Sequence, residues 1–185
     1  MRVITGTARG KKLKSLDGMT TRPTSDMVKE AMFSIIQFEV PSASILDLFA
    51  GSGQLGIEAL SRGAKHCVFV EHDRDALAVV KQNLLDCKFV NDSRVVNMDS
   101  LEYLKVAKNN FDIAILDPPY NMGILEKALP ILEPLMNENS VVICEHEREL
   151  ELPQSIGKLE QTKRYRYGKI VLTVYRIAAD ETGDI

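Results

Sequence analysis

The stretch Ile45–Gly56, ILDLFAGSGQLG, decides the fold of this chain. Its first half is an apolar run typical of a buried strand, and its second half contains the pattern G-x-G-x-x-G, formed by Gly51, Gly53 and Gly56. Glu71 ends the next apolar run, 20 residues after Gly51. This order of strand, glycine-rich turn, helix and acidic residue is typical of a nucleotide-binding crossover. A tight turn that binds no ligand is the alternative interpretation.

Apolar runs and helical periodicity alternate along the rest of the chain. The expected strands cover residues 45–49, 67–70, 95–96, 113–116 and 141–144, and the expected helices cover residues 55–62, 74–85, 100–107 and 124–135. Continuously apolar strands separated by helices predict a parallel sheet with helices on both faces. Residues 156–163 and 169–175 instead predict two edge strands joined by a basic turn, residues 164–168. We therefore expect an α/β fold with a doubly wound, mostly parallel, seven-stranded Rossmann-like sheet and a C-terminal antiparallel hairpin.

About forty residues precede this core. Residues 1–16 predict a small pair of strands with turns at Gly6 and Gly10. A helix follows, with Thr24 or Ser25 as its N-cap and Pro41 as its stop. The expected organisation is an extension over residues 1–40 packed on the core, a core domain over residues 41–178 and a tail over residues 179–185.

The charge is distributed unevenly. The 185 residues carry a net charge of −3, yet residues 1–30 hold seven cations against three acids, and residues 163–169 hold four cations and no acid. Two basic segments on an otherwise acidic chain indicate one face that meets phosphate, although a solvated basic arm would give the same pattern. No apolar run approaches the roughly 20 residues needed to cross a bilayer, and the N-terminus lacks the apolar segment of a signal peptide, so we expect a cytoplasmic protein.

Cysteine and histidine give no sign of a metal site or of disulfide bonds. Three cysteines without C-x-x-C spacing favour buried, reduced thiols. The three histidines form no helical pair, so we expect no metal.

The choice of nucleotide follows from charge. Asp47 lies just ahead of the glycines, where it would repel the pyrophosphate of NAD. S-adenosylmethionine carries an ammonium and a sulfonium instead, so Asp47 becomes a ligand group for it. Glu71 is suited to ribose hydroxyls, and Asp99 to an adenine amino group or, as an alternative, to the N-cap of the next helix. The pattern favours S-adenosylmethionine as the cofactor.

The segment Asp117-Pro118-Pro119-Tyr120 ends the fourth expected strand. Two prolines hold the chain in a rigid bend and present their neighbours at fixed positions. The Asp117 carboxylate and the Pro118 carbonyl could accept the two N–H bonds of an exocyclic amine and align its lone pair for methyl transfer. Tyr120 could stack on the base. A strand end with a core tyrosine is the alternative interpretation.

Together these residues resemble the class I methyltransferases and, more narrowly, the RsmD family of bacterial 16S rRNA guanine-N2 methyltransferases. The resemblance rests on residues 2–13, 21–33, 47–56, 117–120 and 167–169, of which the Arg22-Pro23-Thr24 segment is specific to the family. It implies methylation of one guanine of 16S rRNA at N2, within the small ribosomal subunit or an assembly intermediate. The cations of residues 1–40 add to this the expectation that these residues form an RNA-binding extension. Many relatives carry Phe at the position of Tyr120.

We expect the protein to be a monomer. Its predicted site has three groups of residues. The catalytic residues are Asp117, Pro118 and Tyr120; the cofactor-binding residues are Asp47, Phe49, Gly51, Gly53, Glu71, His72, Asp99 and Ser100; the nucleic-acid-binding residues are Arg2, Arg9, Lys11, Lys12, Arg22, Thr24, Arg164, Arg166 and Lys169. The alternatives are an amino-methyltransferase acting on adenine in RNA or DNA, a non-catalytic RNA-binding or ribosome-assembly module, and, with less support, an NAD-dependent oxidoreductase.

Overall fold

The computed structural model describes residues 1–16 and 25–177 of the chain. Helices and strands alternate up to β5, after which three strands follow. The elements are α1 (Asp26–Ile35), β1 (Ser44–Asp47), α2 (Gln54–Ser61), β2 (His66–Glu71), α3 (Arg74–Cys87), a 3₁₀ turn (Val90–Asp92), β3 (Ser93–Asn97), α4 (Ser100–Val106), β4 (Phe111–Leu116), α5 (Ile124–Leu132), a second 3₁₀ turn (Glu133–Leu135), β5 (Met136–Glu147), β6 (Ser155–Ile156), β7 (Leu159–Tyr167) and β8 (Ile170–Ile177).

The strands form one mixed sheet in the order β3-β2-β1-β4-β5-β8-β7-β6. The five strands from β3 to β5 are parallel, and β8, β7 and β6 continue the sheet in antiparallel pairing. The strand order reverses between β1 and β4, and open α/β sheets bind their ligands at the carboxyl ends of the strands beside such a reversal.

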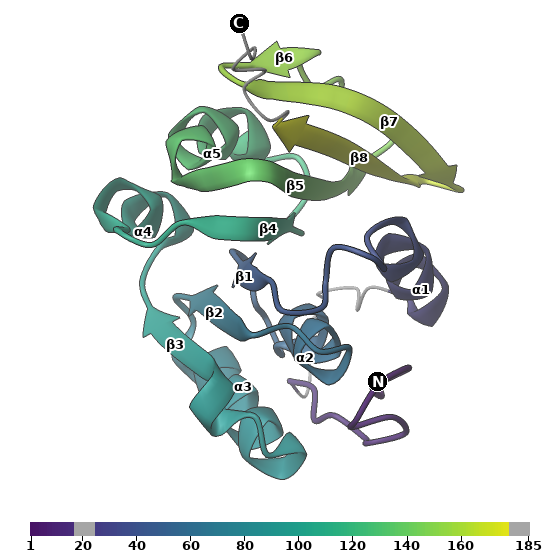
Figure 1. Ribbon diagram of the computed structural model, residues 1–185, viewed down its shortest axis with the longest axis vertical. Helices are drawn as coiled ribbons and strands as arrows, with labels where there is room; N and C mark the ends of the chain where they lie inside the picture. Colours follow the sequence, from purple (N-terminus) through teal and green to yellow (C-terminus); the bar gives the residue numbers. More distant parts are fainter. Residues whose placement is uncertain (17–24, 178–185) are drawn as a thin grey trace, which may run out of the picture.

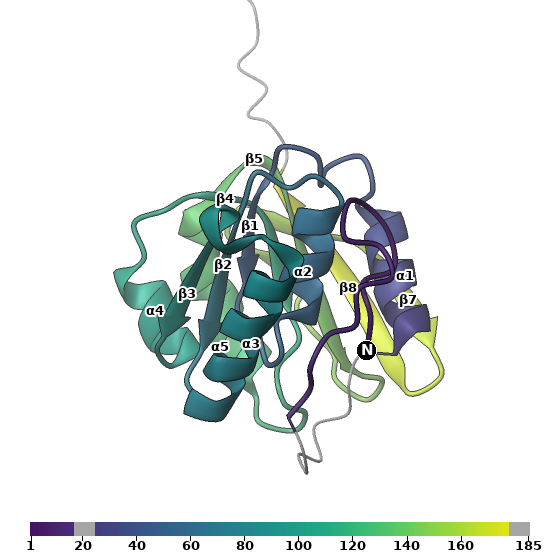
Figure 2. The same cartoon turned by 90° about the horizontal axis from the view of Figure 1, so that it is seen from below.

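Helices cover both faces of the sheet, as Figure 1 shows. On one face, α1, α2 and α3 bury a core that includes Met32, Phe33 and Val80, and on the other face α4 and α5 bury a second core that includes Leu104 and Leu129. The view in Figure 2 places α1 beside the β7–β8 hairpin, where an ion pair of 2.7 Å joins Arg176 to Glu39. The α/β fold with a doubly wound sheet is confirmed, because its central strands are buried on both faces.

Residues 1–16, which we call the N-terminal segment, lie against α2 and α3. The predicted strand pair is reduced to a single antiparallel bridge between Arg2 and Lys12, and Gly6 and Gly10 adopt positive φ angles in the turn between them. Val3 and Leu13 are buried in the core that α1 and α2 cover. Five backbone hydrogen bonds lie within the segment, and the side chains of Glu58, Ser61 and Asn83 in the two helices bond to other groups of its backbone.

Helix α1 begins as predicted and ends early. The Ser25 hydroxyl accepts a hydrogen bond from the Val28 N–H, so Ser25 is the N-cap. The helix stops at Ile35, well before Pro41, because the chain turns there and buries Ile36 and Val40 in the core. Thr24, the other predicted cap, lies outside the described residues.

Two details of the C-terminal prediction are wrong. The sheet has eight strands instead of seven, because Gly157 adopts a φ of +57° and splits the predicted strand 156–163 into β6 and β7. The predicted basic turn 164–168 belongs mostly to β7, and only Gly168 and Lys169 form the turn. Tyr165 and Tyr167 pack against the core, so the alternation of Arg and Tyr is a strand pattern.

We expect Gly56→Ala to destabilise the protein. A Cβ at Gly56 would collide with the Phe69 ring and would come within 2.7 Å of the Cys67 Sγ, both fully buried in β2. Overpacking of a closed core costs about 1–3 kcal/mol, which urea unfolding would measure as a lower midpoint. The exposed Lys81→Ala in α3 is the control, with a change within about 0.5 kcal/mol. An unchanged midpoint for Gly56→Ala would contradict the role of this glycine in helix–sheet packing.

Candidate active site

The candidate site lies at the carboxyl ends of the parallel strands, next to the reversal of strand order. Asp47 ends β1, Glu71 ends β2, Asp99 follows β3 and Asp117 follows β4. The Asp117 and Glu71 carboxylates both raise the pKa of Asp47, so the three groups share one electrostatic environment. The fold thus concentrates negative charge at one edge of the sheet, which suits a cationic ligand.

Residues 48–53, which we call the glycine loop, connect β1 to α2. Gly51 and Gly53 adopt φ angles of +54° and +79°, which L side chains rarely adopt. The Gly51 N–H donates to Glu71 Oε2 at 2.9 Å, and the Gly56 N–H, in the first turn of α2, donates to Asp47 Oδ2 at 3.0 Å. The two carboxylates therefore hold the loop and the first turn of α2 in place.

Asp47 is buried beneath the glycine loop, with a relative exposure of 1%. Burial raises its pKa from 3.8 to about 7; the hydrogen bond from Gly56 opposes this shift, and the nearby Asp117 and Glu71 add to it. The structure thus shows Asp47 bound to backbone rather than lining an open crevice, and its direct contact with a ligand stays a prediction.

Glu71 and Asp99 both bind backbone N–H groups. Glu71 Oε1 accepts from His72 and Asp73 at 2.9 Å each, in addition to the bond that Oε2 accepts from Gly51. Asp99 Oδ1 accepts from Leu101 and Glu102, so Asp99 is the N-cap of α4. The N-cap alternative for Asp99 is confirmed, and a contact between its carboxylate and adenine stays a prediction.

The other predicted cofactor residues surround these carboxylates. Phe49 is half-buried against the core between the sheet and α4, Ser100 begins α4, and His72 is exposed with its Nδ1 3.5 Å from Glu71 Oε1. The topology thus brings Phe49, His72 and Ser100 to the same edge of the sheet. Their role in cofactor binding stays a prediction.

The Asp117-Pro118-Pro119-Tyr120 segment leaves β4 at this edge. Pro118 is buried, and Asp117 and Tyr120 are half-exposed. The Tyr120 hydroxyl donates to Glu145 Oε1 at 3.2 Å, and Glu145 is a buried residue of β5. The phenol is thereby tied to the neighbouring strand. Sequence reasoning missed Glu145, although an acidic residue after the apolar run Val141–Cys144 was a visible signal.

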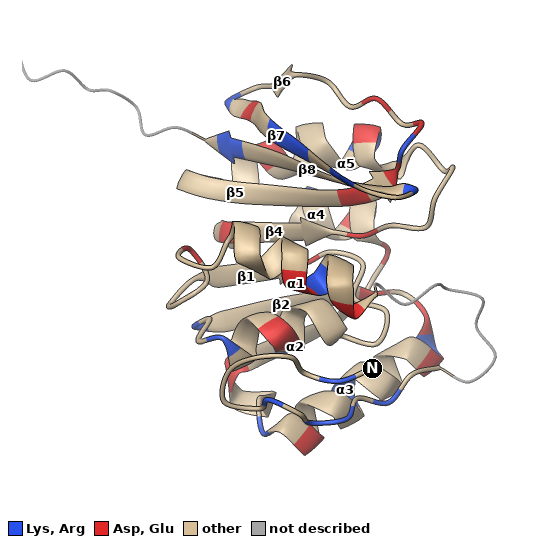
Figure 3. Cartoon of the chain, turned by 90° about the vertical axis from the view of Figure 1, so that its right-hand side faces the viewer, with Lys and Arg blue, Asp and Glu red and all other residues tan. Residues whose placement is uncertain are grey.

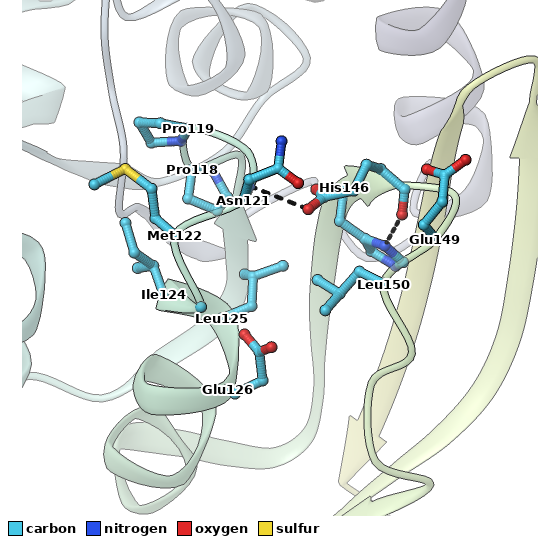
Figure 4. Close-up of a pocket in the computed structure, with 12 residues that line it drawn as sticks. Pro118, Pro119, Asn121, Met122, Ile124, Leu125, Glu126, His146, Glu149 and Leu150 are labelled. Atoms are coloured by element: carbon cyan, nitrogen blue, oxygen red, sulfur yellow. Dashed lines mark hydrogen bonds between the residues drawn. The ribbon is translucent and has the colours of Figure 1, made fainter.

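A cavity of about 340 Å³ opens beside this segment, and Figure 4 shows its lining. Pro118 and Pro119 form one wall, the start of α5 with Leu125 another, and the end of β5 with Glu147 a third. Glu147 Oε1 accepts the Asn121 N–H at 3.1 Å, which fastens the loop after Tyr120 to β5. Apolar walls with a few carboxylates make a site of suitable chemistry for a flat, hydrogen-bonding group such as a nucleobase.

The predicted basic residues fall into two groups, which Figure 3 shows along the N-terminal segment and along β7. Arg2, Arg9, Lys11 and Lys12 are exposed on the segment. Arg166 and Lys169 are exposed at the tip of the β7–β8 hairpin, next to the end of β5, where the Arg148 N–H donates to the Lys169 carbonyl. Arg22 and Thr24 lie outside the described residues.

Arg164 differs from the other predicted phosphate ligands. Its Nη1 lies 2.6 Å from Glu151 Oε2, and its Nη2 donates to the Leu150 carbonyl at 3.4 Å. This guanidinium is already paired and half-buried. The structure therefore supports Arg164 as a phosphate ligand less than it supports the exposed Arg166 and Lys169.

No group of three or more His, Cys, Asp or Glu side chains in residues 1–16 and 25–177 is arranged to hold a metal ion. Within the same ranges, no helix has the length and apolar character to cross a membrane. Cys67, Cys87 and Cys144 are buried free thiols, and burial raises the pKa of each.

Comparison with known proteins gives a consistent result over nearly the whole chain. The family described as conserved hypothetical protein 95 matches residues 1–176. The ribosomal RNA small subunit methyltransferase D of Escherichia coli strain K12 is 33% identical, over 100% of this chain and 93% of its own length. The Bacillus subtilis protein YlbH is 40% identical, over 95% of this chain and 98% of its own. The solved structure of Escherichia coli yhhF superposes with a TM-score of 0.87 at 33% identity, and the match covers 97% of this chain and 99% of that one.

We expect the buried carboxylate of Asp47 to lower stability as the pH rises. The folded protein binds this proton more tightly than the unfolded chain does, so its contribution to stability is lost between pH 3.8 and about 7. Asp47→Asn keeps an acceptor for the Gly56 N–H and removes the titration. The difference in free energy of unfolding, variant minus wild type, should therefore increase as the pH rises through this window, by up to about 1.4 kcal/mol per pH unit.

Thermal unfolding at several pH values would measure this difference. Glu102→Gln, at an exposed position in α4, is the control. If the curves of wild type and Asp47→Asn run parallel from pH 4 to pH 7, Asp47 does not titrate in this range.

Proposed function

The chain belongs to the family of conserved hypothetical protein 95, which includes the ribosomal RNA small subunit methyltransferases D. From this membership we propose that the protein transfers a methyl group from S-adenosylmethionine to the N2 of a guanine in 16S rRNA. The resemblance to the RsmD family that the sequence indicated is thereby confirmed. The observation that carries the proposal is that β1, β2 and β4 end at one edge of the sheet, which brings the glycine loop, held by Asp47 and Glu71, next to the Asp-Pro-Pro-Tyr segment.

The residues at this edge fit S-adenosylmethionine in charge. The carboxylates of Glu71 and Asp117, joined by Asp47 when it is ionised, favour a ligand with an ammonium and a sulfonium, and they disfavour the anionic pyrophosphate of NAD. Glu71 and the left-handed backbone at Gly51 and Gly53 would hold the nucleoside and amino acid ends close to the loop. When bound, this cofactor supplies an electrophilic methyl group.

The Asp-Pro-Pro-Tyr segment then acts on the acceptor amine. The Asp117 carboxylate and the Pro118 carbonyl accept the two N–H bonds, which orients the nitrogen lone pair and eases its loss of conjugation with the ring. In this proposal Asp117 takes the proton that the amine loses as the C–N bond forms and the bond from the methyl group to the sulfonium breaks, with S-adenosylhomocysteine as the leaving group. Tyr120 stacks on the base, and Glu145 fixes the direction of its hydroxyl.

RNA binding is assigned to the two basic groups, one on the N-terminal segment and one at the tip of the β7–β8 hairpin. Residues 1–40 form the RNA-binding extension of the proposal, and Arg166 and Lys169 contact phosphate from the hairpin tip, close to the cavity wall at Glu147. The proposed partner is the small ribosomal subunit or its assembly intermediate, and the proposed location is the cytoplasm.

Transfer of labelled methyl to small ribosomal subunits, naked rRNA and DNA, followed by nucleoside analysis, tests this function. N2-methylguanosine in rRNA would support it. Label on adenine or in DNA would reassign the acceptor to the amino-methyltransferase alternative. Binding of rRNA without transfer to any of the three substrates would favour a non-catalytic assembly module.

We expect Asp117→Ala to abolish catalysis while the donor still binds. Loss of the group that orients the amine and accepts its proton should lower kcat by roughly 10²-fold or more, because general acid–base groups contribute factors of this size. Donor affinity from calorimetry should change little. Tyr120→Phe is the comparison variant, since it keeps the ring that stacks on the base and removes the hydroxyl that bonds to Glu145, so its kcat should fall less than that of Asp117→Ala. A retained rate in Asp117→Ala would remove Asp117 from the chemistry.

We also expect the hairpin-tip cations to contribute more to RNA binding than Arg164 does. Lys169→Ala or Arg166→Ala should weaken rRNA binding and reduce the slope of log K against log salt by about one per lost phosphate contact. Arg164→Ala, whose guanidinium is already paired with Glu151, should change the slope less. Equal effects of all three substitutions would show that the pairing of Arg164 breaks on binding.

A further inference from the structure

The N-terminal segment is anchored to α2 by buried polar side chains. Glu58 is fully buried, and its carboxylate accepts the Ile4 N–H at 2.8 Å and the Thr5 N–H at 3.0 Å. Ser61 accepts the Ala8 N–H and donates to the Thr5 carbonyl. These bonds fix the first half of the segment on the core, and neither side chain is bonded to the glycine loop.

A different residue, Asn83 in α3, holds the second half of the segment. Its Oδ1 accepts the Lys14 N–H at 2.8 Å, and its Nδ2 donates to the Lys14 carbonyl at 3.0 Å. A side-chain amide that pairs with both backbone groups of one residue imitates a strand partner. The side chain is fully buried, so water does not compete for these bonds.

Asn83 also bonds to the glycine loop. Its Nδ2 donates a second hydrogen bond, of 2.9 Å, to the Ser52 carbonyl. Both hydrogens of the amide are therefore in use, one on the segment and one on the loop. The same Ser52 contacts the segment directly, because its hydroxyl donates to the Met1 thioether at 3.6 Å.

The glycine loop has little freedom to move independently of α3. A Cβ built on Gly53 would lie 3.2 Å from Val80 Cγ1, so the helix packs directly beneath the loop. Val80 and Asn83 are one helical turn apart, and together they support Gly53 and Ser52. A displacement of Lys14 would therefore act on the loop through α3 as well as through the Asn83 amide.

We propose that Asn83 is a positioning residue that couples the N-terminal segment to the glycine loop, so that rRNA bound to the segment tightens the binding of the methyl donor. The inference rests on the proposed function, in which the segment contacts RNA and the loop holds the donor. Coupling between two binding sites is reciprocal, so the bound donor also tightens rRNA binding by the same factor. Lys14, whose backbone Asn83 holds, is itself an exposed cation of the segment.

The experiment measures donor affinity with and without RNA. S-adenosylhomocysteine serves as the non-reacting probe, and small-subunit rRNA as the second ligand. In the wild type, rRNA should lower the Kd of the probe by roughly 5-fold or more, the lower end of ordinary coupling between sites. In Asn83→Ala this ratio should fall toward one, because the variant loses both bonds to Lys14 and the bond to the Ser52 carbonyl, and only the Met1–Ser52 contact and the packing of α3 still join the segment to the loop.

Ser61→Ala is the matched control. It removes two bonds between the segment and α2 and leaves the Asn83 amide untouched, so it should weaken rRNA binding yet keep the coupling ratio of the wild type. Circular dichroism of both variants checks that they fold. A wild-type ratio of one, or the same ratio in Asn83→Ala as in the wild type, would overturn the inference. Absence of probe binding to the wild type would instead refute the proposed function itself.

Hydrogen exchange of the wild type gives a second test that needs no variant. Addition of rRNA without donor should slow exchange at the backbone amides of residues 51–53 as well as at Lys14. Slowing that is confined to the N-terminal segment would overturn the coupling, even if Asn83→Ala fails to fold.

Discussion

The hydrogen bond from the Gly56 N–H to the buried Asp47 carboxylate is the interaction on which the site depends. It ties the end of β1 to the first turn of α2, and between them the glycine loop is forced into the left-handed conformations of Gly51 and Gly53. The Glu71 carboxylate fastens the other side of the loop at the Gly51 N–H. A buried carboxylate is costly unless it accepts hydrogen bonds, so the loop and the two acids stabilise one another.

The same principle organises the N-terminal segment. Its backbone makes little regular structure of its own, and Glu58 and Asn83, both fully buried, supply the missing partners. Buried polar side chains of α2 and α3 thus perform the task that neighbouring strands perform in a sheet. The segment becomes part of the core domain and stands next to the glycine loop, although it precedes that loop by some thirty residues in the chain.

Much of the architecture could be predicted from local pattern. The five parallel strands and four helices of the core lie close to the predicted ranges, because apolar runs and helical periodicity reflect burial directly. The errors occurred where pattern is ambiguous. Arg164 to Tyr167 resembles a basic turn by composition, yet it alternates as a strand does, and Gly157 divides a stretch that composition shows as continuous.

The sequence by itself determined the sheet type, the glycine loop and the Asp-Pro-Pro-Tyr bend, because each depends on residue type and spacing within a short segment. Only the tertiary structure decided how the other polar groups are partnered: Asp47 accepts from Gly56, Arg164 pairs with Glu151, and Asn83 joins Lys14 to Ser52. Lys14 and Asn83 are 69 residues apart, and such a pair is fixed only when the sheet brings α3 and the N-terminal segment together. The physical reason is that periodicity reports burial, whereas a hydrogen bond depends on the position of two particular atoms.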